Sequence, residues 1–229
     1  LLFLGLEFLI SEGLKKSKKH HFADWNALFN GEINADVIIN GSSKALVQVS
    51  TIVIDSTLKV NSYNLGINGH DFYMQNSKYF AYTKYNTTPK LVVQIIGNGS
   101  LKKRTDLYAF DQFLPYIDDP IIKEVTQDYI GLTSFDYYLP FVRYFGSKTS
   151  INEGLISFFE CLKKKSDPHR YKGYRPNSAE WDGSFERFVR YCPNGKTIHL
   201  TDTSIQLFKK FLSYHKKENI PLVLVYPPT

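Results

Sequence analysis

The stretch ADVIINGSSKAL, residues 35–46, decides how the rest of this chain can fold. Its Val-Ile-Ile run, residues 37–39, is apolar without alternation, which is typical of a strand covered on both faces in a parallel sheet. The run breaks at an Asn-Gly pair and is followed by Ser42 and Ser43 at the start of helix-like sequence. Because ligands collect at the carboxyl ends of parallel strands, a serine there is a candidate nucleophile, and it is equally a favoured helix N-cap.

Strands that end in a glycine-bearing loop before helix-like sequence occur three times in the first hundred residues. After the first strand, residues 44–58 predict a helix, and a short strand around Tyr63 and Leu65 leads into a loop with two glycines. Residues 71–85 carry apolar side chains at helical spacing, and KLVVQIIGNGS, residues 90–100, is a third buried strand with its own Gly-Asn-Gly turn. This alternation is the signature of βαβ units and predicts an α/β fold with a parallel sheet.

The alternation stops between residues 101 and 200. This region is rich in Tyr, Phe, Asp and Pro, and it predicts short helices without a core strand. An insertion of that length in an α/β domain is more often a functional lid than a connector. The sheet resumes at the end, where an amphipathic helix with Thr201 or Asp202 as its N-cap precedes an apolar strand at 222–226.

Composition places the chain among globular proteins. Hydrophobic residues make up 43% of it and charged residues 22%, which is ordinary for a packed domain. The aromatic share of 15% suits clefts that face glycans, although most such rings pack in cores. The net charge of +6 comes without a helix-turn-helix, zinc-finger or RNP pattern, so nucleic acid is not an expected partner.

Cys161 and Cys192 are the only cysteines in the sequence. They lack CxxC spacing, which argues against a zinc site and leaves a single disulfide open. Neither GxGxxG nor GxxxxGK[ST] occurs, which argues against a nucleotide-binding domain. Neither a metal nor an organic cofactor is therefore expected.

The first ten residues, LLFLGLEFLI, allow two interpretations. They are apolar enough for the end of a membrane anchor, but they are too few to span a bilayer, which takes about 20 residues. The alternative is an amphipathic first helix. On the anchor interpretation, residues 1–22 are the remnant of a signal anchor plus a basic linker, and residues 23–229 form a single α/β domain.

Three loops at predicted strand ends carry the polar residues that catalysis would need. They contain Gly41-Ser42-Ser43, the stretch 64–71 with Gly69, and the stretch 97–100. In a parallel sheet these loops converge on one edge. A serine hydrolase requires a nucleophile there, donors for the developing oxyanion, and a histidine that accepts the serine proton.

The three blocks 36–45, 62–71 and 94–101 resemble the SGNH/GDSL hydrolase superfamily, and more closely a cell-envelope branch of it whose first block is Gly-Ser-Ser. The Phe-Leu-Pro-Tyr, Tyr-Lys-Gly-Tyr and Trp-Asp-Gly segments of the insertion also resemble that branch. The resemblance implies a three-layer α/β/α flavodoxin-like sandwich with a parallel sheet and an aromatic-rich insertion at about 101–200.

By the resemblance, Ser43 is the nucleophile and its backbone N–H is one oxyanion donor. Gly69 matches the glycine whose N–H is the second donor, and Asn98 matches the asparagine whose side chain is the third. Losing one such donor typically costs on the order of 10² to 10³ in rate. Each residue also has a structural alternative: Ser42 or Ser43 caps a helix, Gly66 and Gly69 supply positive φ, and Asn98 forms a turn.

The sequence departs from the superfamily in the last block, an Asp-x-x-His near the C-terminus that supplies the base. None of the six histidines lies in such a motif, and the chain stops at YPPT after the strand that would precede it. The simplest account is a fragment of a longer protein, and this chain is expected to be nearly inactive, because a serine without a base is a poor nucleophile. His70 beside Gly69 is the nearest substitute, but its place in a glycine turn predicts a surface residue.

The leading hypothesis is an SGNH-type serine esterase or O-acyltransferase of the cell envelope, periplasmic or membrane-anchored. Its substrate would be an acylated envelope or extracellular glycan, or a small ester. The alternative is a non-catalytic envelope protein that uses the same scaffold to bind glycan or protein.

Overall fold

The computed structural model describes residues 2–97, 99–159, 170–178, 180, 182–195 and 197–227. The chain divides into two compact units, which are described separately. Unit 1 comprises Leu1–Asn34, Ser77–Thr88 and Arg104–Pro168, and unit 2 comprises Ala35–Asn76, Pro89–Lys103 and His169–Thr229. The boundary passes through helix α5, Phe72–Tyr85, whose first residues belong to unit 2.

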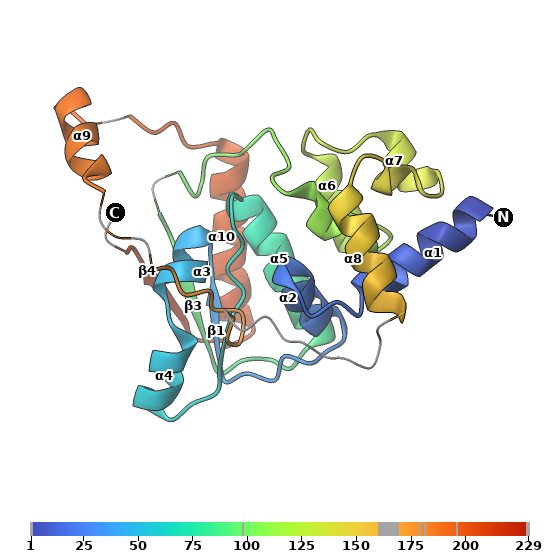
Figure 1. Ribbon diagram of the computed structural model, residues 1–229. Helices are drawn as coiled ribbons and strands as arrows, with labels where there is room; N and C mark the ends of the chain where they lie inside the picture. Colours follow the sequence, from blue (N-terminus) through green and yellow to red (C-terminus); the bar gives the residue numbers. More distant parts are fainter. Residues whose placement is uncertain are drawn as a thin grey trace. The chain divides into compact units, whose positions relative to one another are not determined.

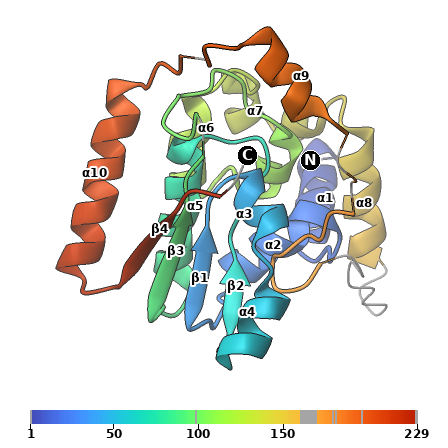
Figure 2. The same ribbon diagram turned by 90° about the vertical axis from the view of Figure 1, so that its left-hand side faces the viewer.

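Unit 2 contains a four-stranded, all-parallel sheet in the order β2-β1-β3-β4 (Figure 2). In the register of the strands, Ile38 lies between Tyr63 and Val92. The prediction of an α/β fold with a parallel sheet is therefore confirmed. The strands are β1 Val37–Asn40, β2 Ser62–Asn64, β3 Leu91–Ile95 and β4 Leu222–Val225.

Helices cover both faces of this sheet (Figure 1). On one face Ile39 and Ile95 pack with Ala45 of α3, Ser43–Gln48, and with the neighbouring α4, Thr51–Leu58. The other face carries α10, Asp202–Lys217, and the first turn of α5, which meet through the ring of Phe72 and two phenylalanine rings of α10. This arrangement is compatible with the predicted three layers.

The single helix predicted over 44–58 is wrong, since two helices occupy this stretch. The backbone of Val49 is extended, and the Ser50 side chain accepts a hydrogen bond from Val53 N at 3.4 Å. A serine at that position starts a new helix by capping it. At α10 the predicted cap position is confirmed for Thr201, but its hydroxyl accepts from Lys103 N at 3.1 Å instead of from the helix.

The described residues of the region 101–200 form short helices, as predicted. Its described residues form no strand of the sheet, only isolated bridges such as that between Tyr171 and Tyr174. Cys192 is a free, half-buried cysteine, and Cys161 lies outside the described residues. The elements are η1 Phe110–Tyr116, α6 Pro120–Gln127, α7 Ser134–Tyr138, η2 Val142–Tyr144, α8 Lys148–Phe159 and α9 Ser184–Tyr191.

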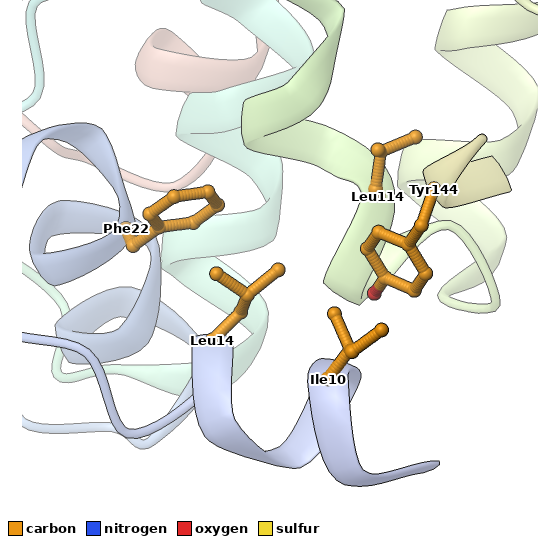
Figure 3. Packing of buried hydrophobic residues seen from close by; sticks show 5 residues of the cluster. All are labelled: Ile10, Leu14, Phe22, Leu114 and Tyr144. Atoms are coloured by element: carbon orange, nitrogen blue, oxygen red, sulfur yellow. The ribbon is translucent and has the colours of Figure 1, made fainter. Parts of the chain in front are cut away.

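Unit 1 is helical and has its own core. Helix α1, Leu2–Leu14, contributes two side chains to a buried cluster and runs against α8. The two helices approach closely at Gly13, where an added Cβ would lie 1.7 Å from the carbonyl oxygen of Gly154. Figure 3 shows the cluster, in which Ile10, Leu14, Phe22 of α2 (His20–Phe29), Leu114 and Tyr144 face one another.

The apolar N-terminal stretch is therefore a helix that packs within unit 1. Its charged residue Glu7 faces inward and pairs with Arg143 at 3.0 Å, while Leu2, Phe3 and Phe8 are exposed. Among the described residues, none of the helices combines the length and the apolar character needed to cross a membrane.

Candidate functional site

The loops after β1, β2 and β3 meet at the carboxyl edge of the sheet, as predicted. Gly41 O in the first loop accepts from Ile67 N in the second at 3.0 Å. The second loop runs on into α5, and Phe72 N donates to Ser100 O in the third loop at 2.9 Å. Backbone hydrogen bonds therefore hold the three candidate segments together within unit 2.

Two glycines make this close approach possible. Gly41 has a φ of +153°, and a Cβ there would lie 2.9 Å from the Cβ atoms of Ala45 and Ile95. A Cβ on Gly66 would lie 2.6 Å from Leu46 N. The interpretation of Gly66 as a source of positive φ is wrong, because its backbone is not left-handed and its role is close packing on α3.

The two serines after β1 have different roles. Ser42 is the N-cap of α3, and its hydroxyl accepts a hydrogen bond from Lys44 N at 3.4 Å. Ser43 is the first helical residue and is half-buried. Its hydroxyl forms no hydrogen bond to any described residue. Capping therefore accounts for Ser42 but not for Ser43.

Gly69 lies in the turn after β2 with a φ of +72°, so the predicted left-handed backbone is confirmed. Within the described part of the chain, neither the N–H of Ser43 nor that of Gly69 donates a hydrogen bond. No acceptor among the described residues therefore occupies either N–H group. The third predicted donor, Asn98, lies outside the described residues.

His70 and Asp71 follow this turn and are both buried, with 4% and 3% of their surface exposed. The prediction that His70 is a surface residue is therefore wrong. Asp71 caps α5 by accepting from Met74 N at 3.3 Å, and the His70 carbonyl accepts from Gln75 Nε2 at 3.0 Å. The histidine's own carbonyl and the next residue are thus both held to the start of the helix, and the imidazole is buried beside it.

A buried amide network that the sequence interpretation missed lies under the same edge. Asn40 Nδ2 donates to Gln94 Oε1 at 2.8 Å, and Gln94 Nε2 reaches Gln75 Oε1 at 3.3 Å. All three side chains are fully buried. The sequence did carry a signal for this network: Asn40 ends the apolar strand β1 and Gln94 lies inside the apolar strand β3. Because buried amides require hydrogen-bond partners, two such residues on neighbouring strands predict a pair.

Lys44 was also missed. Its Nζ is buried and forms no hydrogen bond to a described residue. The side chain extends from α3 past Gly97, and Nζ lies 5.8 Å from the ring centroid of Tyr226. A positive charge therefore lies among the loops that follow β1, β3 and β4.

The Tyr-Lys-Gly-Tyr segment packs against the outer strand β2. Asn64 N donates to Lys172 O at 2.9 Å, and a Cβ on Gly173 would lie 1.9 Å from Asn64 O. Lys172 Nζ also bonds Asp55 at 2.6 Å. Burial raises the pKa of Asp55, but hydrogen bonds from Lys172 and Ser62 outweigh it and leave that pKa below its ordinary value.

This edge brings together a serine hydroxyl and two backbone N–H groups without partners among the described residues, and an ammonium nearby. No group of three or more His, Cys, Asp and Glu residues in the described ranges could hold a metal ion. Comparisons with protein-family models, with curated proteins and with solved structures find no match for this chain.

Proposed function

We propose that the carboxyl edge of the unit 2 sheet is the active site of an SGNH-type serine esterase or O-acyltransferase. Its substrates would be acylated envelope or extracellular glycans, or small esters, outside the cytoplasm. The observation that carries the proposal is that the two serines differ: Ser42 caps α3, whereas the hydroxyl and N–H of Ser43 have no hydrogen-bond partner among the described residues.

The strand order supports the proposal. The order β2-β1-β3-β4 is that of the first four strands of a flavodoxin-like sheet, which the resemblance to SGNH hydrolases implies. In open parallel sheets ligands bind beyond the carboxyl ends of the strands. Ser43 and Gly69 both lie at that edge, in loops joined by the bond between Gly41 and Ile67.

In the proposed reaction, Ser43 Oγ attacks the acyl carbonyl carbon and its proton passes to the departing oxygen, which leaves as the alcohol; water, or an acceptor hydroxyl in a transferase, then takes the acyl group from Ser43. The N–H groups of Ser43 and Gly69 would stabilise the oxyanion, with Asn98 as the third donor of the superfamily pattern. Each such donor is worth on the order of 10² to 10³ in rate. His70 is the histidine of the same loop, but the sequence holds no Asp-x-x-His, so we expect slow turnover by this chain.

The second candidate is a non-catalytic protein that binds glycan or protein on this scaffold. One observation favours it: the Ser43 hydroxyl has no imidazole within hydrogen-bond distance among the described residues. A nucleophilic serine ordinarily has an adjacent base.

Labelling with a fluorophosphonate probe, together with 4-nitrophenyl acetate turnover, distinguishes the two candidates. The wild-type chain, Ser43→Ala and Ser42→Ala should be compared. For an enzyme, the probe modifies Ser43, and turnover is lost in Ser43→Ala but kept in Ser42→Ala. The unfolding free energy should show the opposite pattern, because only Ser42→Ala removes the cap, at a cost of about 1 kcal/mol.

If the probe leaves Ser43 unmodified and Ser43→Ala does not change turnover, the esterase proposal is wrong. Binding of an acetylated polysaccharide that survives Ser43→Ala would then favour the binding protein.

A further inference from the structure

Among the described residues, the buried ammonium of Lys44 has none of the hydrogen-bond acceptors that a lysine normally has. A lysine carries three N–H donors, and a buried donor without an acceptor is costly. Lys44 Nζ is buried, and within the described ranges it forms no hydrogen bond and no ion pair. A buried donor without a partner in the protein indicates that a ligand supplies the hydrogen-bond acceptor.

The position of Lys44 is where a ligand is expected. The chain leaves β1 toward β2 on one side and leaves β3 toward β4 on the other, so the crevice between β1 and β3 is the topological switch point of the sheet. Ligands of open α/β sheets bind at this point. Lys44 follows β1, and its side chain passes over Gly97, which follows β3.

The described residues beside the ammonium offer it no hydrogen-bond acceptor. A Cβ on Gly97 would lie 3.3 Å from Lys44 Cδ and 3.5 Å from Nζ, so a larger residue there would press on the side chain. Tyr226, after β4, offers only its ring, with the centroid 5.8 Å from Nζ. A ring face attracts the charge but accepts no ordinary hydrogen bond in place of a carboxylate.

We propose that Lys44 binds an anionic oxygen group of the ligand, a carboxylate or a phosphate, at the switch point. Because Lys44 follows Ser43 directly, the inference rests on the proposed function and gives its substrate class: esters that carry a negative charge close to the acyl group. A charge-assisted hydrogen bond is shorter and stronger than a neutral one, so removing the ammonium should be measurable in binding and in rate.

The binding test does not depend on catalysis. Inorganic phosphate and succinate should each be titrated into the wild-type chain, Lys44→Met, Lys44→Arg and the control Lys210→Met, with thermal unfolding and NMR shifts as readouts. Lys210 lies on the exposed side of α10, so the control removes one positive charge elsewhere in unit 2. We expect saturable binding in the wild type, Lys44→Arg and the control, and at least tenfold weaker binding in Lys44→Met. The anion that binds more tightly shows whether Lys44 prefers a phosphate or a carboxylate.

Equal affinity of Lys44→Met and the wild type for both anions, or no binding by any of the four proteins, overturns the inference.

The substrate test compares the half-ester of succinate with 4-nitrophenol, which carries a carboxylate, with neutral 4-nitrophenyl butyrate. We expect the wild type to prefer the charged ester by about tenfold or more in kcat/KM, and Lys44→Met to lose the preference while Lys44→Arg keeps it. An unchanged preference in Lys44→Met contradicts the inference.

The two tests separate the inference from the proposed function. If no ester is turned over but phosphate or succinate binds in a Lys44-dependent way, the esterase proposal fails and the anion site stands. If Ser43-dependent turnover occurs without any effect of Lys44, the esterase proposal stands and the anion site fails.

Discussion

Lys78 of α5 is a lysine buried inside unit 1, and replacing it should stabilise the protein in a strongly pH-dependent way. Only 2% of its surface is exposed, and its ammonium lies 4.9 Å from the ring centroid of Trp25. Burial lowers the pKa of Lys78 from 10.5 to about 7. Between these two values the unfolded chain binds a proton that the folded protein does not, so stability rises with pH in this window.

The size of the effect follows from the shift. One pKa unit corresponds to about 1.36 kcal/mol, so the charged Lys78 costs about 5 kcal/mol at pH 6, where both states are protonated. At pH 10 the folded Lys78 is neutral. The cost has fallen to about 1 kcal/mol, because pH 10 is so close to the unfolded pKa of 10.5 that the lysine loses its proton easily. The contact with Trp25 offsets about 1 to 2 kcal/mol of this cost while the lysine is charged.

The variant Lys78→Met keeps the shape of the side chain and removes the charge. We expect its unfolding free energy to exceed that of the wild type by about 3 kcal/mol at pH 6 and by less than about 1 kcal/mol at pH 10. Urea denaturation followed by circular dichroism at pH 6, 7, 8, 9 and 10 measures the difference. The control Lys210→Met should differ from the wild type by the same small amount at each pH. A difference between Lys78→Met and the wild type that does not change with pH would refute the reasoning.

Two further predictions concern unit 1. Gly13→Ala should destabilise the protein by at least about 3 kcal/mol, because its Cβ would lie 1.7 Å from the Gly154 carbonyl oxygen. The control Gly5→Ala, on the same helix, has nothing within 4 Å of its Cβ and should be neutral or slightly stabilising. Equal effects of the two substitutions on the unfolding free energy in urea would contradict the close crossing of α1 and α8. Arg143→Met should cost about 3 to 5 kcal/mol, because it leaves the Glu7 carboxylate partly buried without its partner at 3.0 Å. Adding Glu7→Gln should recover part of this loss in the same assay, and no recovery would show that the ion pair is not the cause.

The strands could be predicted because their sequences allow few alternatives. Unbroken apolar runs such as 37–39 are compatible with a strand covered on both faces, and glycine-bearing loops mark their ends. The break between α3 and α4 was not predictable from spacing, because apolar residues continue through Val49 and a serine is common inside and outside helices.

The burial of His70 and Lys44 could not be predicted because distant parts of the chain cause it. The sequence around His70 has the composition of a turn, and the residues that hold its loop, such as Ser100, come from another strand end. Lys44 is enclosed by Gly97 and Tyr226, which are remote in sequence. Local patterns report local structure, while these two side chains owe their surroundings to the way parallel strands bring separate loops to one edge.

The start of α3 decides which side chain of the Gly-Ser-Ser-Lys stretch is available for function. Had the helix begun one residue later, Ser43 would be the cap and its hydroxyl would be occupied by a backbone N–H. Gly41 fixes the start, because its left-handed backbone and the lack of a Cβ let the chain turn tightly against Ile95. The cap at Ser42 then follows, Ser43 forms no hydrogen bond through its hydroxyl to a described residue, and the Lys44 side chain reaches the loop after β3. The candidate nucleophile and the candidate anion site therefore depend on the same turn, and a substitution at Gly41 should affect both.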